Sequence, residues 1–573
     1  MKRTCTIFLL LILAMATQSC RNPDGSFDNY LDEVFLYFIG EDPLNISNAL
    51  YYPETYDLHE KPVVALDLNY ENYLSYYEGL EKIKMDLLEY DYISDKNTLT
   101  KAILIDYINR ELAFSDLYFH NTYLQSYLGY QAQLPIILAE YRFDNLYDID
   151  NYFAYLKNTK YVFSQFIKFE KDKITIGQGL SKRVIRRTIA QCAEFLNTET
   201  PFLIPVFNNK IDNLDFLSEL EKEELKAINQ NLVENEFLSA YRYLRNELIG
   251  LEAVASYQAQ GGLATLPDGK EYYEALFQKV TGSNYTVLEA KEYLEMILQE
   301  KLTKYSKDNL IYDAVYNFDS DFMGDLEIND LIPYFTLSME DDFPKLDVVV
   351  NYQIKTIDES MQENSSPAMY LISPIDDNRD EVIYINDLYF NAPNNYTFKT
   401  IAHEGYPGHL YHNVYIKNAD IPSVRKILNY VGYFEGWATY VENYVIKYGG
   451  GTKFTQEVFE FYDSINYIIL GILDIGINYE GWTLAYAGEY LNHYFELTKE
   501  EVEEIYYDLI ELPTNYLQYY FSYYLLKDLK KYFQDKMKDG YSDYLFHEIY
   551  LETGPAPFWI LEEQYKKYAQ ENT

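Results

Sequence analysis

The sequence predicts a mainly α-helical protein with one small β-sheet. Over most of the 573 residues, apolar side chains recur at three- and four-residue spacings, which is typical of amphipathic helices. Only two short segments, 344–353 and 381–386, are rich in β-branched residues and flanked by Asp, Asn or Pro, as strands are. Hydrophobic residues make up 48% of the chain, which indicates a globular protein long enough for two to four domains.

The composition excludes some classes of partner. The formal net charge is −43, whereas contacts with nucleic-acid phosphates need a positive surface. The same charge disfavours direct binding to anionic membrane surfaces. The three cysteines, Cys5, Cys20 and Cys192, are too few for a disulfide framework.

Residues 1–20 have the features of a secretory signal. Lys2 and Arg3 precede an apolar run at 7–16 that is too short for a permanent membrane span. The segment ends in TQSC, which resembles a bacterial lipoprotein cleavage site, although Thr17 stands where Leu is usual. We therefore expect an extracytoplasmic protein, either secreted or anchored to the cell envelope by a lipid on Cys20. No later segment has eighteen uninterrupted apolar residues.

The rest of the chain is predicted to form two helical halves. In the N-terminal half, residues 21–259, helices are expected at 72–90, 98–119, 149–171 and 217–248. The Gly-containing segment 260–269 is the expected seam. The catalytic half, residues 260–573, is expected to hold helices at 272–306, 397–415, 424–448, 454–497, 499–511, 516–537 and 541–551.

The strongest functional signal is the segment 401–412, which reads IAHEGYPGHLYH. Two imidazoles and an adjacent carboxylate are what a zinc hydrolase needs. In a regular helix two zinc-binding histidines stand at i and i+4, but position i+4 from His403 is Pro407, and His409 is at i+6. We expect Pro407 and Gly408 to kink or bulge the helix and so bring His409 back beside His403.

A second segment, EGWATYVE at 435–442, supplies carboxylates to the same site. Glu442 is seven residues beyond Glu435, so both side chains share one helix face. We expect Glu435 to bind the metal and Glu442 to orient a histidine. Glu404 is the expected general base, which activates the attacking water and passes its proton to the leaving amine. His412, at i+3 from His409, is expected to flank the metal.

These motifs resemble a bacterial family known as "domain of unknown function 885". The resemblance is carried by HEGYPGH, EGWATYVE, DIGINYEGWT at 474–483, PTNYLQY at 513–519 and GPAP at 554–557, and it covers most of the chain after the signal segment. The family is similar to helical gluzincin-like peptidases such as the carboxypeptidase Taq and thimet oligopeptidase groups. The resemblance implies a large helical body with a deep central groove that admits short peptides, and a small β-sheet beside the metal.

The resemblance also implies roles for single residues. His403, His409 and Glu435 look like the metal ligands, and Glu404 looks like the catalytic base. Tyr519 matches a family tyrosine that could donate to the developing oxyanion.

Further residues are candidates for substrate binding. In gluzincins an edge strand pairs with the substrate backbone, and residues 382–386, with Tyr384 and Asn386, are the candidate for that strand. An ordinary structural hairpin is the alternative. Arg379 is a candidate for binding a substrate carboxylate, because a guanidinium binds carboxylates bidentately.

The sequence also departs from the family pattern. Asn478 stands where the family usually has His, and we expect it to donate to a substrate carbonyl. Asp508 stands where the family often has Arg, which puts recognition of a substrate carboxylate in question.

Three hypotheses follow. The first is a zinc peptidase acting on short peptides, with nickel, cobalt or manganese as alternatives for the metal. The second is a catalytically weak surface lipoprotein of the same fold that binds peptides. The third is a metallohydrolase that uses the same site on a non-peptide amide or ester.

Overall fold

A computed structural model gives the fold of residues 23–58, 61–63, 66–197, 200–255, 260–305, 326–357, 362, 366–377, 379–390, 395–449 and 452–572. The signal segment with Cys20 lies outside these residues. Within them, no helix combines the length and the apolar character needed to cross a membrane.

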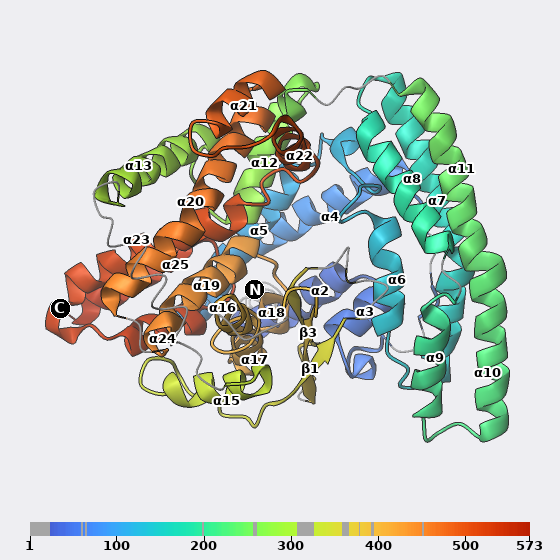
Figure 1. Ribbon diagram of the computed structural model, residues 1–573. Coiled ribbons are helices and arrows are strands. Elements are labelled where there is room, and N and C mark those ends of the chain that lie inside the picture. The colour runs from blue at the N-terminus through green and yellow to red at the C-terminus, as the bar shows by residue number, and fades with distance from the viewer. Residues whose placement is uncertain are drawn as a thin grey trace, which may run out of the picture.

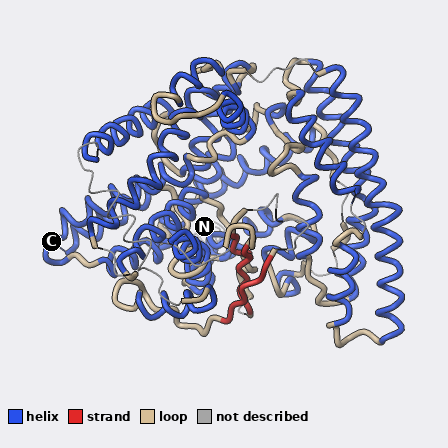
Figure 2. The backbone as a smooth tube through the Cα atoms, viewed as in Figure 1, coloured by secondary structure: helices blue, strands red, loops and turns tan. Residues whose placement is uncertain are grey.

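Helices make up most of the described chain, as the sequence predicts (Figures 1 and 2). The first group is α2 (Pro23–Ile39), α3 (Pro43–Ala49), α4 (Tyr70–Leu88), α5 (Asp95–Leu112), α6 (Tyr130–Glu140), α7 (Leu146–Thr175), α8 (Lys182–Asn197), α9 (Leu203–Asp212), α10 (Glu219–Leu232) and α11 (Leu238–Val254). Short turns of 3-10 or π-helix accompany them: η1 (Pro53–Tyr56), η2 (Tyr118–His120) and η3 (Val233–Phe237).

The second group begins after the Gly-containing seam. Its helices are α12 (Gly269–Thr281), α13 (Val287–Tyr305), α15 (Ile328–Ser338), α16 (Asn395–Glu404), α17 (His409–Asn418), α18 (Ser423–Lys426), α19 (Val431–Tyr444), α20 (Lys453–Asn478), α21 (Leu484–Leu491), α22 (Lys499–Glu511), α23 (Ser522–Met537), α24 (Asp543–Thr553) and α25 (Phe558–Asn572). Its short turns are η4 (Gly262–Thr265), η6 (Val445–Lys447), η7 (Leu517–Phe521) and η8 (Lys538–Gly540).

Local capping signals fix where several of these helices start. Ser218 and Glu221 form a capping box at the start of α10, in which each side chain bonds the backbone N–H of the other residue. Thr498 and Glu501 form the same box at the start of α22. These contacts satisfy backbone donors that a helix start leaves free, so the boundaries follow from the sequence itself.

The sheet has three strands, β1 (Asn351–Thr356), β2 (Ala368–Leu371) and β3 (Asp380–Ile385). Their order is β1-β3-β2, with β1 parallel and β2 antiparallel to β3. The expectation that residues 382–386 form a free edge is therefore wrong, because β3 is paired on both sides. The edge strand that contacts α16 is β2, whose four residues are too few to show an alternation in the sequence.

The described chain has two buried apolar cores, and they do not divide at residue 259. One core joins α2–α5 with the helices of the second group, including residues such as Phe27, Phe277 and Trp437. The other core is built from residues 124–255, including Phe163 and Tyr241. In Figure 1 its helices α7, α8, α10 and α11 run side by side along one edge of the molecule. The first helices of the chain thus pack with the part that carries the histidine cluster.

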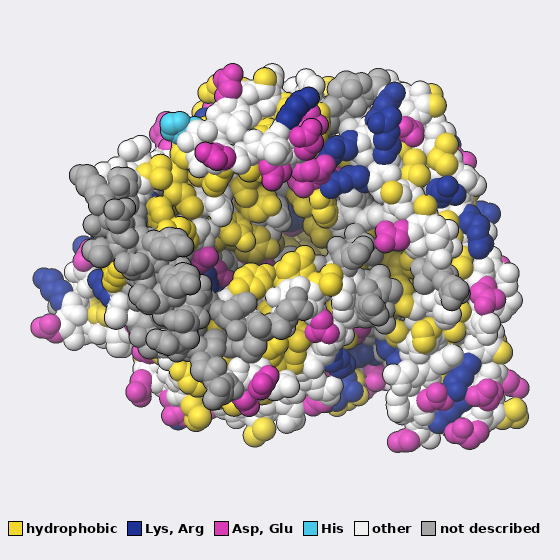
Figure 3. All heavy atoms as spheres, in the orientation of Figure 1, with side chains coloured by type: hydrophobic (Ala, Val, Ile, Leu, Met, Phe, Trp, Pro, Cys, Tyr) yellow, Lys and Arg dark blue, Asp and Glu magenta, His cyan; other side chains and the backbone are white. Residues whose placement is uncertain are grey.

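The sheet lies where these two parts meet. β2 contacts α16, and on β3 the Tyr384 hydroxyl donates to Glu140 at the end of α6, with 2.9 Å between the oxygens. Figure 3 shows the surface of the molecule in the orientation of Figure 1. The middle of this surface is hollowed, and apolar side chains line much of the visible wall of the hollow.

Candidate metal centre

The helix predicted at 397–415 is in fact two helices, α16 and α17, separated at residues 405–408. Pro407 has no N–H to continue the helical hydrogen bonds. Its carbonyl instead accepts a bond from Trp437 Nε1 on α19 at 2.9 Å. Helical bonding resumes with His412 N donating to Gly408 O at 2.9 Å. The helix is therefore interrupted completely, whereas the sequence predicts only a kink or bulge.

Gly408 permits this interruption because it lies against the end of α16. A Cβ atom at this position would stand only 1.9 Å from the His403 carbonyl oxygen, a distance at which atoms overlap. Without that side chain, α17 starts directly beside the last turn of α16. The ring centroids of His403 and His409 are consequently 4.8 Å apart, with the rings nearly perpendicular at 84°. The predicted approach of His409 to His403 is confirmed.

Glu435 completes the cluster from α19. One ligand atom from each of His403, His409 and Glu435 lies within 4.8 Å of the others, and these residues are the group in the described chain arranged to hold a metal ion. Glu435 Oε2 is 3.6 Å from Nε2 of each histidine. Burial alone would raise the pKa of Glu435, but the two imidazoles outweigh it and hold the pKa well below its usual range.

The residues of this cluster fit a divalent cation. Glu435 Oε2 is buried and has no hydrogen-bond partner among the described residues, which is costly for a carboxylate oxygen. In a tetrahedral zinc site, bonds of about 2.0–2.1 Å place neighbouring ligand atoms roughly 3.3 Å apart. The 3.6 Å separations are close to that spacing and too long for good hydrogen bonds. Two imidazoles and one carboxylate also match the donor set of many catalytic zinc sites.

Glu442 contacts His403 at the ring nitrogen that faces away from Glu435. Its Oε2 is 3.2 Å from His403 Nδ1, which leaves Nε2 directed toward Glu435. Lys399, one turn before His403 on α16, lies 3.9 Å from Glu442 Oε1 and also forms an ion pair with Asp463 on α20. Burial would raise the pKa of Glu442, but Lys399 and His403 lower it, so the carboxylate stays ionised.

Glu404 lies at the end of α16, next to His403 in the chain. Its Oε2 accepts a hydrogen bond from the backbone N–H of Tyr370 on β2 at 2.8 Å. The edge strand therefore fixes the carboxylate that the sequence analysis predicts to be the base.

Tyr519 lies on the π-helical turn η7, close enough to Glu435 and Glu404 to feel their charges. Burial raises the pKa of its phenol above the ordinary value, and the nearby carboxylates of Glu435 and Glu404 raise it further. The hydroxyl is therefore protonated at neutral pH and able to donate a hydrogen bond.

Asn478 does not have the predicted role. Its side chain is fully buried, and Nδ2 donates to Asp474 Oδ1 at 2.7 Å and to the Leu509 carbonyl at 2.9 Å. Its Oδ1 accepts from Leu263 N at 3.3 Å. Because both amide hydrogens are already used, Asn478 has none to donate to a substrate. Its hydrogen bonds connect α20 to η4 and to α22.

His412 also departs from the expectation. It is fully buried against the rings of Tyr433, Phe434, Trp437 and Tyr550, with centroid distances between 4.9 and 6.1 Å. Neither ring nitrogen has a hydrogen-bond partner in the described part of the chain, and burial lowers the pKa far below the usual value. His412 is a neutral packing residue and orients no metal ligand.

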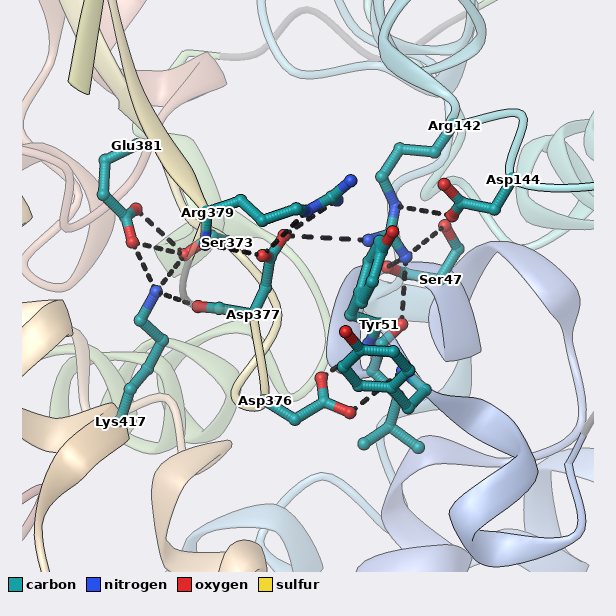
Figure 4. Close-up of polar contacts among 12 residues, drawn as sticks. Ser47, Tyr51, Arg142, Asp144, Ser373, Asp376, Asp377, Arg379, Glu381 and Lys417 are labelled. Atoms are coloured by element: carbon teal, nitrogen blue, oxygen red, sulfur yellow. Dashed lines mark hydrogen bonds and ion pairs between the residues drawn. The ribbon is translucent and has the colours of Figure 1, made fainter. Parts of the chain in front are cut away.

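The three predicted substrate-binding residues are engaged elsewhere. Asn386 is fully buried, and its Nδ2 donates to the backbone carbonyls of Gln362 and Ser366. Tyr384 points toward α6, where it binds Glu140. Arg379 forms a bidentate pair with Asp377 and stacks 3.6 Å above the ring of Tyr51, as Figure 4 shows. The structure does not bring these three side chains to the cluster.

A buried ion pair supports the strand beside Glu404. Lys417 on α17 binds Glu381 on β3 and donates to Ser373 Oγ at 2.6 Å (Figure 4). Glu381 Oε2 in turn accepts from the Tyr370 hydroxyl at 2.5 Å. This network joins the helix that carries His409 to the strand that holds Glu404.

Sequence reasoning did not find Lys399, Asp463 and Tyr370. Lys399 carries a local signal, because it stands four residues before His403 on the same helix face. Asp463 and Tyr370 reach the site from distant segments, and nothing in their sequence neighbourhood marks them.

A cavity of about 700 Å³ lies apart from this cluster. It is lined by residues of α3, η1, the start of α7 and the segments before η1 and α7, including Tyr51, Arg142 and Asp148, and by none of the cluster residues.

Comparison with known proteins shows the fold and the family. No curated protein matches the chain. A crystal structure described as a "putative lipoprotein" from Colwellia psychrerythraea is similar at 16% identity and a TM-score of 0.77, covering 96% of this chain and 100% of that one. A second structure, described as a "putative lipoprotein of unknown function" from Shewanella oneidensis, is similar at 14% identity and a TM-score of 0.60, covering 94% and 99%. The model of the family "Bacterial protein of unknown function (DUF885)" matches residues 72–302 and 327–564, and the chain belongs to that family.

Proposed function

We propose that the protein is a metal-dependent hydrolase that cleaves short peptides, with His403, His409 and Glu435 holding a divalent cation. The observation that carries this proposal is the buried Oε2 of Glu435, which has no hydrogen-bond partner in the part of the chain that the structure describes and stands 3.6 Å from Nε2 of both histidines. Zinc is the metal that this donor set favours, and nickel, cobalt or manganese could take the same ligands. When bound, such a cation supplies Lewis acidity for polarising a carbonyl and activating water.

The residues around the cluster supply the proton transfers. Glu404 takes the proton of the attacking water on its carboxylate and passes it to the nitrogen of the leaving amine. The Tyr370 N–H keeps that carboxylate oriented by binding Oε2. Tyr519 remains protonated at neutral pH and donates its phenolic hydrogen toward the oxyanion that develops on the substrate carbonyl.

The edge strand β2 is the place we assign to the substrate backbone. Its inner side pairs with β3, and Tyr370 on its outer side donates to Glu404. A peptide added along this outer edge would therefore run past the proposed base, as peptides do when they extend a sheet. This assignment replaces the one made for residues 382–386.

The second hypothesis also finds support. Both similar solved structures are described as a "putative lipoprotein", one of them "of unknown function", which suits a peptide-binding lipoprotein without turnover. The lipid anchor on Cys20 and the location at the cell envelope are common to the first and second hypotheses, and both are part of this proposal. The third hypothesis, a non-peptide amide or ester substrate, uses the same ligands and the same base.

Metal analysis and peptide digestion test the proposal. We expect the purified protein to retain about one equivalent of zinc and to cleave members of a short-peptide library. Glu404→Gln should keep the metal and lose cleavage, whereas the exposed Glu500→Gln on α22 should change neither. Metal retained with peptide bound but never cleaved would favour the second hypothesis. Protein that binds no divalent metal would contradict the assignment of the three ligands.

A further inference from the structure

Three tyrosines stand around the carboxylates of the proposed metal site. Tyr396 lies on α16 two turns before His403, so both side chains share one face of that helix. Tyr467 lies on α20 one turn after Asp463, which binds Lys399 on α16. Tyr467 therefore faces α16 as well. Its ring centroid is 6.3 Å from that of Tyr519, the proposed donor.

Tyr467 is held in place by neighbouring rings, and both Tyr467 and Tyr396 are open to solvent. Tyr467 stacks on the buried Tyr520 with centroids 4.6 Å apart, and it meets the edge of Tyr516 at 5.7 Å. Tyr467 is still 36% exposed and Tyr396 is 48% exposed. A pre-arranged aromatic surface next to a polar reaction centre is the usual composition of a ligand pocket.

The electrostatic surroundings of these rings select against acidic groups. Burial raises the pKa of Tyr467, and the carboxylates of Glu442 and Asp463 raise it further. Burial also raises the pKa of Tyr396, with contributions from Glu442 and Glu404. The phenols are therefore neutral and stand beside negative charges. Lys399, the cation between these carboxylates, is already paired with two of them.

We propose that Tyr396, Tyr467 and Tyr519 form a subsite for a neutral aromatic or large aliphatic side chain next to the scissile bond. This inference rests on the proposed function, because it names the peptides that the site prefers. An aromatic side chain would gain contact with the ring faces and remove them from water. A substrate Asp or Glu would meet carboxylates and leave its own charge unpaired.

Blocked alanine hexapeptides that carry one Phe, Leu, Ala or Asp at the third position test the subsite. Mass spectrometry locates the cleaved bond, and initial rates give kcat/KM for each peptide. We expect Phe and Leu to direct cleavage to one of their flanking bonds, with kcat/KM about tenfold or more above that of the Ala peptide. The Asp peptide should be the poorest substrate.

Variants of Tyr467 then separate the subsite from general damage. Tyr467→Ala should lower kcat/KM for the Phe peptide about tenfold and change the Ala peptide less than twofold. Tyr467→Phe should keep the preference, because the ring remains. Tyr486→Ala, at a 52% exposed tyrosine on α21, is the matched control and should change neither peptide.

Equal rates for the Phe, Ala and Asp peptides would overturn the inference, as would equal losses on all peptides in Tyr467→Ala. Failure of the proposed function gives a different result, in which the metal-loaded protein cleaves none of the peptides. Calorimetric binding of the same peptides then decides the inference. Tighter binding of the Phe peptide than of the Ala peptide, lost in Tyr467→Ala, supports the subsite, and equal or absent binding refutes it.

Discussion

Glu442 Oε2 lies 3.2 Å from His403 Nδ1, on the side of the imidazole opposite Glu435. A carboxylate in this position fixes the tautomer and the orientation of a histidine ligand. Lys399 pairs with this carboxylate and also with Asp463, so one face of α16 is tied to both α19 and α20.

The first prediction is that Glu442→Gln weakens metal binding without abolishing it. The amide keeps the size of the side chain but loses the charge that favours the oriented imidazole. Loss of such a partner usually costs 10–100-fold in metal affinity, and we expect a change of about that size. Competition with a chromogenic chelator measures it. Glu500→Gln serves as the control, and an unchanged affinity in Glu442→Gln would show that Glu442 does not orient a ligand.

The second prediction concerns the interruption between α16 and α17. Gly408→Ala would place a methyl group 1.9 Å from the His403 carbonyl oxygen, so the two helices must move apart. We expect a loss of unfolding free energy of roughly 2 kcal/mol or more, together with a loss of metal affinity. Urea unfolding and chelator competition measure the two effects.

Gly250→Ala is the matched control for that substitution. Gly250 lies within α11, and no atom stands within 4 Å of the position of an added Cβ. Alanine there should stabilise the protein by roughly 0.5–1 kcal/mol, as it does in a helix interior. If Gly408→Ala behaved like Gly250→Ala, the close approach of the two helices would not be what positions His409.

The residues of the cluster differ in how far the sequence determines them. His403, His409 and Glu435 were predictable because each has a local signature, namely an adjacent carboxylate, a Pro-Gly break and a helical repeat to Glu442. The extent of the break was not predictable, because it depends on a hydrogen bond that Trp437, a residue of another helix, donates to the Pro407 carbonyl. Most of the helices were predictable for the same reason, because the spacing of apolar residues that marks a helix is local in the sequence.

Asn478 and the strands show where local reasoning ends. A family motif placed Asn478 near the chemistry, but its amide is also bound by Leu509 and Leu263 from two distant segments, besides Asp474 on its own helix. Strand order likewise depends on pairing between distant segments, and β2, with four residues, is too short to show a strand pattern in the sequence. Both errors concern contacts that are distant in sequence.

The third prediction is that the buried pair of Lys417 and Glu381 is costly to break. Both side chains are almost fully buried, so Lys417→Met leaves a carboxylate without its cation. We expect the free energy of unfolding to fall by about 3–5 kcal/mol. Lys345→Met is the control, because Lys345 pairs with Glu340 on the surface and its loss should cost at most about 1 kcal/mol. Similar losses in both variants would contradict the prediction.

The fourth prediction is a pH dependence of stability that arises at Asp474. Burial raises the pKa of this carboxyl to about 7, although hydrogen bonds from Asn478 Nδ2 and Thr514 N oppose the shift. The unfolded chain titrates near an ordinary value of about 3.9, so between pH 4 and 7 the folded state binds one more proton. The free energy of unfolding should therefore fall as pH rises through this window, by roughly 4 kcal/mol at most, and this contribution should be constant above it. Asp474→Asn removes the titrating group, so urea unfolding at pH 4.5, 5.5, 6.5 and 7.5 should show the variant gaining on the wild type with each step. A constant difference between the two proteins across these pH values would show that Asp474 is ionised in the folded protein throughout.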